Sequence, residues 1–134
     1  MSWMIDEYNV LTGEQGIGTL TGKPLELGGS LGRTQATGYG VALAAKLALE
    51  KLGKSTEGAK FAVQGFGNVG SYTVDTAVKF GATVVAVTER DDDGVQYAVY
   101  REEGLSYAEL QECKDNRVRF HTLPNTKRLT LDEF

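Results

Sequence analysis

The chain has few of the residues that most often carry catalysis, metal binding or cross-links. Cys113 is its only cysteine and His121 its only histidine among 134 residues. A single thiol excludes an internal disulfide and a cysteine cluster for zinc, and His121 has no obvious partner along the sequence. We therefore expect a packing or surface role for Cys113, and we predict no catalytic and no metal-ligating residue in this chain.

The chain also lacks an excess of basic charge and a long apolar run. Its formal net charge is −4, and its fourteen lysines and arginines are scattered, which argues against a nucleic-acid partner. No apolar stretch approaches the roughly 20 residues that span a bilayer, and residues 1–7 lack a basic region followed by an apolar one. These absences predict a cytoplasmic protein without a membrane or nucleic-acid partner, of a size that suits one domain by default.

Glycine, by contrast, is frequent, and residues 65–70 read G-F-G-N-V-G. The mostly apolar run 60–64 before this motif predicts a buried strand. Apolar residues then recur every three or four positions until Gly81, which predicts a helix and its end. The β-branched run 83–88 predicts a second, parallel strand with Glu89 at its carboxyl end. The spacing therefore predicts one βαβ unit with the glycines in its strand-to-helix turn.

Each glycine of this turn has a physical task in a dinucleotide site. Gly65 permits the tight turn, Gly67 lets the backbone approach a pyrophosphate, and Gly70 allows close packing of the helix on the strand. The first N–H groups of the helix and its dipole then favour the phosphates. The candidate cofactor-binding residues of this unit are Gly65, Phe66, Gly67, Asn68, Val69, Gly70, Glu89 and Arg90. The alternative is a glycine turn of an α/β protein that binds no nucleotide.

The residue after the second predicted strand bears on the choice of cofactor. A carboxylate at Glu89 would accept hydrogen bonds from an adenosine ribose diol and would repel a 2′-phosphate, which favours NAD over NADP. Arg90 complicates this prediction, because an adjacent guanidinium would pair with a 2′-phosphate if the loop turned it inward. The aspartates 91–93 follow and make the local field acidic. We predict NAD as the cofactor, with NADP less favoured.

Two helices are predicted before the βαβ unit. Apolar residues over 3–11 predict a short amphipathic helix ended by Thr12 and Gly13, and residues 14–32 are glycine-rich and irregular. A strong apolar pattern from Thr34 or Gln35 to Leu52 predicts a long helix, closed by Gly53.

After the βαβ unit the predicted elements are shorter. Residues 95–100 alternate in polarity as a short strand does. Ser106 and Glu109 have the spacing of a capping box, which predicts a helix over 109–114, and Thr130 and Glu133 repeat that spacing near the carboxyl end of the sequence.

Three segments together closely resemble the cofactor-binding domain of glutamate dehydrogenases. They are residues 3–8, residues 63–70 and residues 22–40, which read G-K-P-L-E-L-G-G-S-L-G-R-T-Q-A-T-G-Y-G. The related leucine and phenylalanine dehydrogenases share the glycine turn, whereas the pattern of 22–40 resembles the glutamate branch. The resemblance implies that Arg33 and Thr37 lie beside the nicotinamide end of the cofactor. The residues alone also allow a helix cap at Thr34 or Thr37 and a solvated charge at Arg33.

The resemblance implies a Rossmann-like α/β fold, a parallel sheet with flanking helices. Because fewer strands are visible than in a full doubly wound domain, we expect a truncated form, the amino-terminal half of a nucleotide-binding domain. Residues 1–33 would be a remnant helix and loop from the inter-domain region, and residues 34–134 the partial dinucleotide-binding domain. One edge of the sheet would be unpaired and apolar, which invites self-association.

The resemblance also implies an activity, the oxidative deamination of L-glutamate to 2-oxoglutarate and ammonia with hydride transfer to NAD. In that family the catalytic lysine and aspartate motifs belong to a substrate domain, and neither motif is in this sequence. We therefore expect the chain to be inactive alone and to be part of an enzyme that is usually a homo-oligomer. The alternative is a non-enzymatic nucleotide-binding module that acts through a partner chain.

Overall fold

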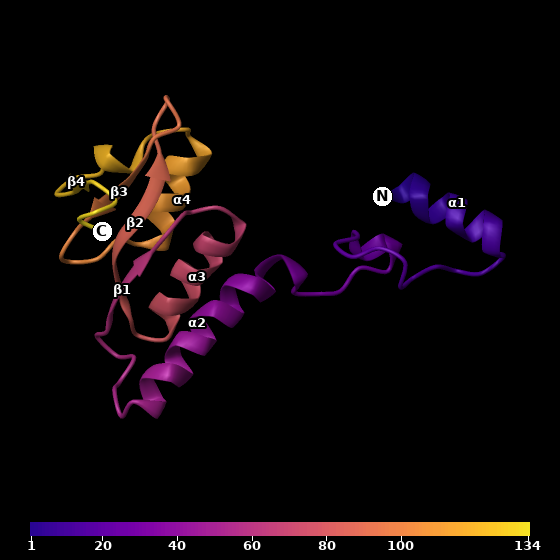
Figure 1. The fold of residues 1–134 in the computed structure, drawn as a ribbon, viewed down its shortest axis with the longest axis horizontal. Coiled ribbons are helices and arrows are strands. Elements are labelled where there is room, and N and C mark those ends of the chain that lie inside the picture. Colours follow the sequence, from indigo (N-terminus) through magenta and orange to yellow (C-terminus); the bar gives the residue numbers. More distant parts are fainter. The chain divides into compact units, whose positions relative to one another are not determined.

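A computed structural model describes all residues from Met1 to Phe134, which form two compact units. The first unit is Met1–Thr34 and the second is Gln35–Phe134. The second unit contains the sheet and most of the helices of the chain (Figure 1). The division lies one residue from the predicted boundary between residues 33 and 34, and what each part represents in a longer protein stays a prediction.

The amino-terminal unit begins with helix α1, Ser2–Thr12, as predicted. Gly13 ends it in the left-handed conformation with φ 71°, and its N–H donates to the carbonyl of Asn9 over 2.9 Å. The following glycine-rich stretch is irregular except for the 3₁₀ helix η1, Leu25–Leu27. Only Ile5 of α1 is buried, so this unit contributes little apolar core.

Helix α2, Arg33–Lys51, confirms the long predicted helix, and Gly53 follows it with φ 70°. Within the second unit, α2 runs beside helix α3, Asn68–Lys79 (Figure 1). Gly38 makes this close approach possible, because a Cβ there would lie 2.5 Å from the Cβ of Tyr72 and 2.6 Å from the carbonyl oxygen of Val69. Glycine at this position therefore lets the two helix backbones touch.

The sheet contains four strands in the order β1-β2-β3-β4. Strands β1, Lys60–Val63, and β2, Thr83–Arg90, pair in parallel, and α3 connects them along the chain. The predicted βαβ unit is therefore confirmed. Strands β3, Gln96–Tyr100, and β4, Lys127–Leu129, are antiparallel to their neighbours. The α/β fold class is confirmed with a parallel β1–β2 pair, and the sheet as a whole is mixed.

The link between β2 and β3 explains the change of strand direction. A parallel return needs a crossover of about a dozen residues or more, whereas this link covers only residues 91–95. Its ends are joined by hydrogen bonds from the Asp91 N–H to the Val95 carbonyl, 2.9 Å, and from the Val95 N–H to Asp91 Oδ1, 2.8 Å. Gly94 takes φ 79° in this turn, so the chain reverses as a hairpin.

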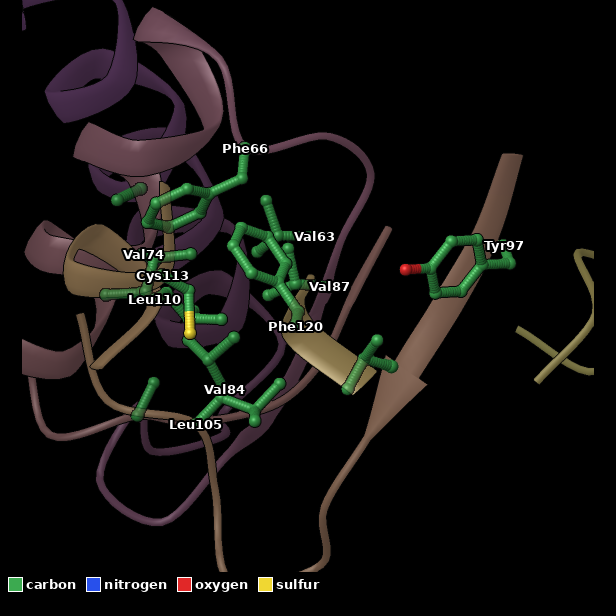
Figure 2. Packing of buried hydrophobic residues seen from close by; sticks show 14 residues of the cluster. Val63, Phe66, Val74, Val84, Val87, Tyr97, Leu105, Leu110, Cys113 and Phe120 are labelled. Atoms are coloured by element: carbon green, nitrogen blue, oxygen red, sulfur yellow. The ribbon is translucent and has the colours of Figure 1, made fainter. Parts of the chain in front are cut away.

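The core lies between the sheet and the helices α3 and α4 (Figure 2). Helix α4, Tyr107–Asp115, starts at the predicted cap, where the Glu109 N–H donates to Ser106 Oγ over 3.3 Å. Cys113 of this helix is buried in the core, and burial, followed by the charges of Glu112 and Glu109, raises the pKa of its thiol. Of the packing or surface role expected for Cys113, this buried position agrees with packing.

The sheet leaves one edge strand without a partner on its outer side. Strand β1 pairs on one side only, so the sheet has an unpaired edge at its apolar residues 61–63. None of the helices is both long enough and apolar enough to cross a membrane.

Candidate functional site

A pocket of about 640 Å³ opens where β1 and β2 end, the edge at which parallel strands of α/β sheets usually bind ligands. Its walls come from the glycine turn, the paired ends of β2 and β3, the end of α4 and the 3₁₀ helix η2, Phe120–Thr122. The lining residues are Gly65, Phe66, Thr88, Glu89, Arg90, Asp92, Gln96, Lys114, Arg117, Val118, Arg119 and Phe120.

The three glycines of the turn have different environments, each suited to its predicted task. Gly65 has φ 88°, which favours glycine, two residues after the end of β1. A Cβ on Gly67 would meet no atom within 4 Å, so the space above this residue is open. A Cβ on Gly70 would lie 2.8 Å from the carbonyl carbon of Gly65 and nearer still to its oxygen. The turn is therefore tight at its first and third glycines and open at its second.

Phe66 anchors the turn from inside the protein. Its side chain is buried and meets Phe120 edge-on, with ring centroids 5.3 Å apart. Figure 2 shows both rings among Val63 and Val87 of the parallel strands. The core thus holds the turn and η2 against each other on two sides of the pocket.

Thr88 is a site residue that sequence analysis missed. It is fully buried, and its hydroxyl oxygen accepts hydrogen bonds from the Gly65 N–H, 2.8 Å, and from Gln96 Nε2, 2.9 Å. These bonds tie the glycine turn to the ends of β2 and β3. A threonine suits any β-strand, so the only signal was its polarity within a run of valines and alanine.

Glu89 lies next to it, half-buried, with both of its protein hydrogen bonds on one oxygen. Glu89 Oε1 accepts from the Phe120 N–H over 2.7 Å and from the Tyr97 hydroxyl. The Tyr97 oxygen also lies 2.9 Å from Nδ1 of His121. An ionised carboxylate only accepts, so the single hydroxyl proton of Tyr97 points to Glu89 and His121 donates from Nδ1. His121 therefore has a partner that the sequence did not reveal.

The environment of Tyr97 keeps it a hydrogen-bond donor. Burial, and then the hydrogen bond and charge of Glu89, raise the pKa of Tyr97 far above its ordinary value. The guanidinium of Arg128 lies 3.9 Å from the centre of its ring and also pairs with Asp91 at 2.8 Å. Packing and a cation thus hold the ring while its hydroxyl remains protonated.

Basic side chains line part of the pocket. Arg119 pairs with Asp92, whose hydrogen bond raises the pKa of Arg119, and it also donates to the Arg90 carbonyl. The Arg90 side chain is exposed at the pocket. The acidic field predicted for residues 91–93 is therefore partly neutralised, since two of the three aspartates have arginine partners.

The structure brings only part of the predicted set to the pocket wall. Gly65, Phe66, Glu89 and Arg90 line it, and Gly67, Asn68, Val69 and Gly70 continue the turn into the first residues of α3. Arg33 and Thr37 are exposed in the first turns of α2, and their place beside a nicotinamide stays a prediction. No group of three or more histidine, cysteine, aspartate and glutamate side chains is arranged to hold a metal ion.

Comparison with known proteins identifies the family of this chain. Residues 28–133 match the profile of the glutamate/leucine/phenylalanine/valine dehydrogenases. The chain belongs to this dehydrogenase family. Among curated family members, it is 52% identical over 134 residues to the NAD-specific glutamate dehydrogenase of Clostridioides difficile, and 44% identical over 135 residues to that of Peptoniphilus asaccharolyticus. Each match covers the whole of this chain and 32% of the relative.

Solved structures of the family share the fold. The glutamate dehydrogenase of P. asaccharolyticus superposes with a TM-score of 0.79 at 45% identity, over 87% of this chain and 30% of that one. The hetero-hexameric enzyme from Thermus thermophilus, in its leucine-bound form, gives 0.72 at 35% identity over 92% and 28%. The chain thus spans about a third of the length of the relatives that it matches.

Proposed function

We propose that this chain is the NAD-binding part of a glutamate dehydrogenase and that it is catalytically incomplete alone. One observation carries the proposal: the glycine turn, through Gly65 and Phe66, and the half-buried Glu89 border the same pocket, at the ends of two parallel strands. The 52% identity to a protein described as an NAD-specific glutamate dehydrogenase supports the choice of cofactor.

The residues present fit a dinucleotide. The open space over Gly67 admits a pyrophosphate, and Gly67 carries no side chain to cap the first turn of α3, whose N–H groups favour phosphate oxygens. Glu89 would take the ribose hydroxyls. By family resemblance, Arg33 and Thr37 would lie at the nicotinamide end. NAD supplies the hydride acceptor when bound, and the task of this chain is to hold and orient it.

The preference for NAD over NADP rests on the charge of Glu89. A 2′-phosphate beside this carboxylate would meet repulsion that a ribose diol does not meet. Arg90, Lys114 and Arg117 face the same pocket and would attract a phosphate, so the preference is expected to be finite rather than absolute.

The remaining parts of the proposal concern the longer protein. L-Glutamate and 2-oxoglutarate would bind only in the complete enzyme, because the lysine and aspartate motifs of the family are not in this sequence. The complete enzyme would be an oligomer. We place it in the cytoplasm, because proteins of this reducing compartment rarely contain disulfides and this chain, with one cysteine, has no internal disulfide.

The test is calorimetric titration of the folded chain with NAD and, separately, with NADP. We expect saturable NAD binding and weaker NADP binding. Gly67→Val should abolish both, because the new side chain fills the space proposed for the pyrophosphate. Gly40→Val is the matched control, since a Cβ on Gly40 of α2 also meets nothing within 4 Å. Equal NAD affinity of the parent and the Gly67→Val chain would refute the placement of the cofactor.

Catalytic incompleteness has its own measurement. The chain mixed with L-glutamate and NAD should produce no NADH above the protein-free rate. Turnover by the purified chain would contradict this part of the proposal and leave the binding part intact.

A further inference from the structure

The hydrogen bonds of Glu89 are distributed unequally between its two oxygens. Oε1 accepts from the Phe120 N–H and from the Tyr97 hydroxyl, whereas Oε2 accepts no hydrogen bond from the protein. Glu89 itself borders the pocket. The protein thus holds one oxygen of the carboxylate and leaves the other available to a ligand.

The two donors fix the carboxylate from different parts of the fold. Tyr97 is directly opposite Glu89 in the β2–β3 ladder, so the two side chains lie on the same face of the sheet. Phe120 belongs to η2, which the core holds through the contact with Phe66. A carboxylate with two donors on one oxygen has little freedom to turn about its last torsion.

Tyr97 is itself held in place and kept protonated. It is 3% exposed, with His121 Nδ1 at 2.9 Å from its oxygen and the Arg128 guanidinium 3.9 Å from its ring centre. Figure 2 shows the ring reaching from β3 with its hydroxyl turned toward the side of Phe120. Its hydroxyl therefore donates to Glu89 throughout the neutral pH range.

We propose that Tyr97 is a positioning residue for cofactor selection: its hydroxyl, with the Phe120 N–H, holds Glu89 so that the free oxygen meets the ribose hydroxyls and the fixed charge repels a 2′-phosphate. This inference rests on the proposed function, because it assigns a role within the same site. Without the hydroxyl, Glu89 can turn away, which weakens the contact with NAD and relieves the repulsion of NADP.

The test compares Tyr97→Phe with the parent chain by titration with NAD and NADP. NAD binding should weaken about two- to tenfold, the range expected when a ligand must immobilise a side chain that the protein no longer holds. NADP binding should stay the same or improve, so the ratio of the two dissociation constants falls. A purely structural role would weaken both nucleotides alike, and an unchanged ratio would overturn the inference.

Tyr100→Phe is the matched control. Tyr100 lies on the same strand, and its hydroxyl donates to the exposed Glu102 instead of the pocket. The same chemical change there should leave the ratio unaltered.

A double-mutant cycle separates this inference from the proposed function. Glu89→Ala alone should narrow the preference for NAD, and if it does not, the assignment of Glu89 is wrong whatever Tyr97 does. In the Glu89→Ala background, Tyr97→Phe should have no further effect on the ratio. An equal effect in both backgrounds would show that Tyr97 does not act through Glu89.

Crystal structures of the parent and the Tyr97→Phe chain test the geometry without a nucleotide. The carboxylate of Glu89 should keep one orientation in the parent and turn or become multiple in the variant. An unmoved carboxylate in the variant would overturn the positioning role even if the isolated chain bound neither nucleotide.

Discussion

Replacing Gly70 by alanine tests the most constrained contact of the glycine turn. The new Cβ would overlap the carbonyl oxygen of Gly65 and lie 2.8 Å from its carbonyl carbon, so one of the two backbone segments would have to shift. Gly65 cannot yield easily, because its N–H is bonded to the buried hydroxyl of Thr88 and its backbone takes φ 88° two residues after the end of β1. The strain therefore falls on backbone atoms that the sheet holds.

The size of the effect follows from two opposing terms. Overpacking costs about 1–3 kcal/mol, and a rigid backbone contact belongs at the upper end of that range. Alanine in place of a helical glycine returns up to about 1 kcal/mol of helix propensity. The net loss in the free energy of unfolding is therefore about 2 kcal/mol, which lowers the urea midpoint by about 1 M for a domain of this size.

Urea unfolding followed by circular dichroism measures this loss, and Gly40→Ala provides the control. Gly40 lies inside α2 with open space around its Cβ position, so alanine there should stabilise the chain by about 0.5–1 kcal/mol. A free energy of unfolding for Gly70→Ala equal to that of the parent, or higher, would refute the argument that Gly65 and Gly70 are in forced contact.

Two further predictions concern the groups around the pocket. Thr88→Val leaves the Gly65 N–H and the Gln96 amide without their acceptor and should lower the free energy of unfolding by about 1–3 kcal/mol in urea unfolding. Thr88→Ser keeps the hydroxyl and should retain most of the stability. Equal losses in the two variants would exclude the hydroxyl as the cause. The pKa of Tyr97 is raised in the folded chain above its ordinary 10.0, so the unfolded chain loses this proton at a lower pH than the folded chain does. The contribution of the Tyr97 hydroxyl to stability is therefore complete below pH 10 and is lost as pH rises beyond 10. The Tyr97→Phe chain should therefore lose stability less steeply than the parent above pH 10, and parallel curves would contradict the shift.

The elements that could be predicted from the sequence are those whose signals are local. The βαβ unit follows from an apolar run, a glycine turn and a β-branched run, and each was found in the expected order. The caps at Gly13, Gly53 and Ser106 were equally visible, because capping chemistry depends on neighbouring residues.

The sequence contains a local signal for the chain reversal between β2 and β3. The resemblance to a parallel sheet nevertheless led to the expectation of parallel strands. Asp93-Gly94 between two strand-like runs is a strong hairpin signal, and the five-residue link is too short for a parallel crossover. Strand β4 has only three residues, Lys127–Leu129, and two of them are charged. The strand is therefore too short to show the alternation of polarity that predicts a strand.

The candidate site was predictable only in the part that belongs to the turn and to β2. Glu89 stands out at the end of a buried strand, whereas Tyr97 and His121 are distant from it in sequence and have ordinary alternatives as packing residues. The contact of Tyr97 with Glu89 depends on strand pairing, and the contact of His121 with Tyr97 depends on where η2 begins. The position of η2 is a tertiary fact with no trace in residue spacing.

The hairpin at residues 91–95 connects a local sequence signal with the tertiary contact between Tyr97 and Glu89. Its closing bonds pair Arg90 with Gln96, and the next rung therefore pairs Glu89 with Tyr97. A shift of one residue would send the Tyr97 side chain to the other face of the sheet, away from the carboxylate. Asp91 closes the turn through the Val95 N–H and also pairs with Arg128, whose guanidinium covers the Tyr97 ring. The first residue of the acidic run thus builds the register that places a hydroxyl against Glu89, and its effect on the site is one of geometry as well as of charge.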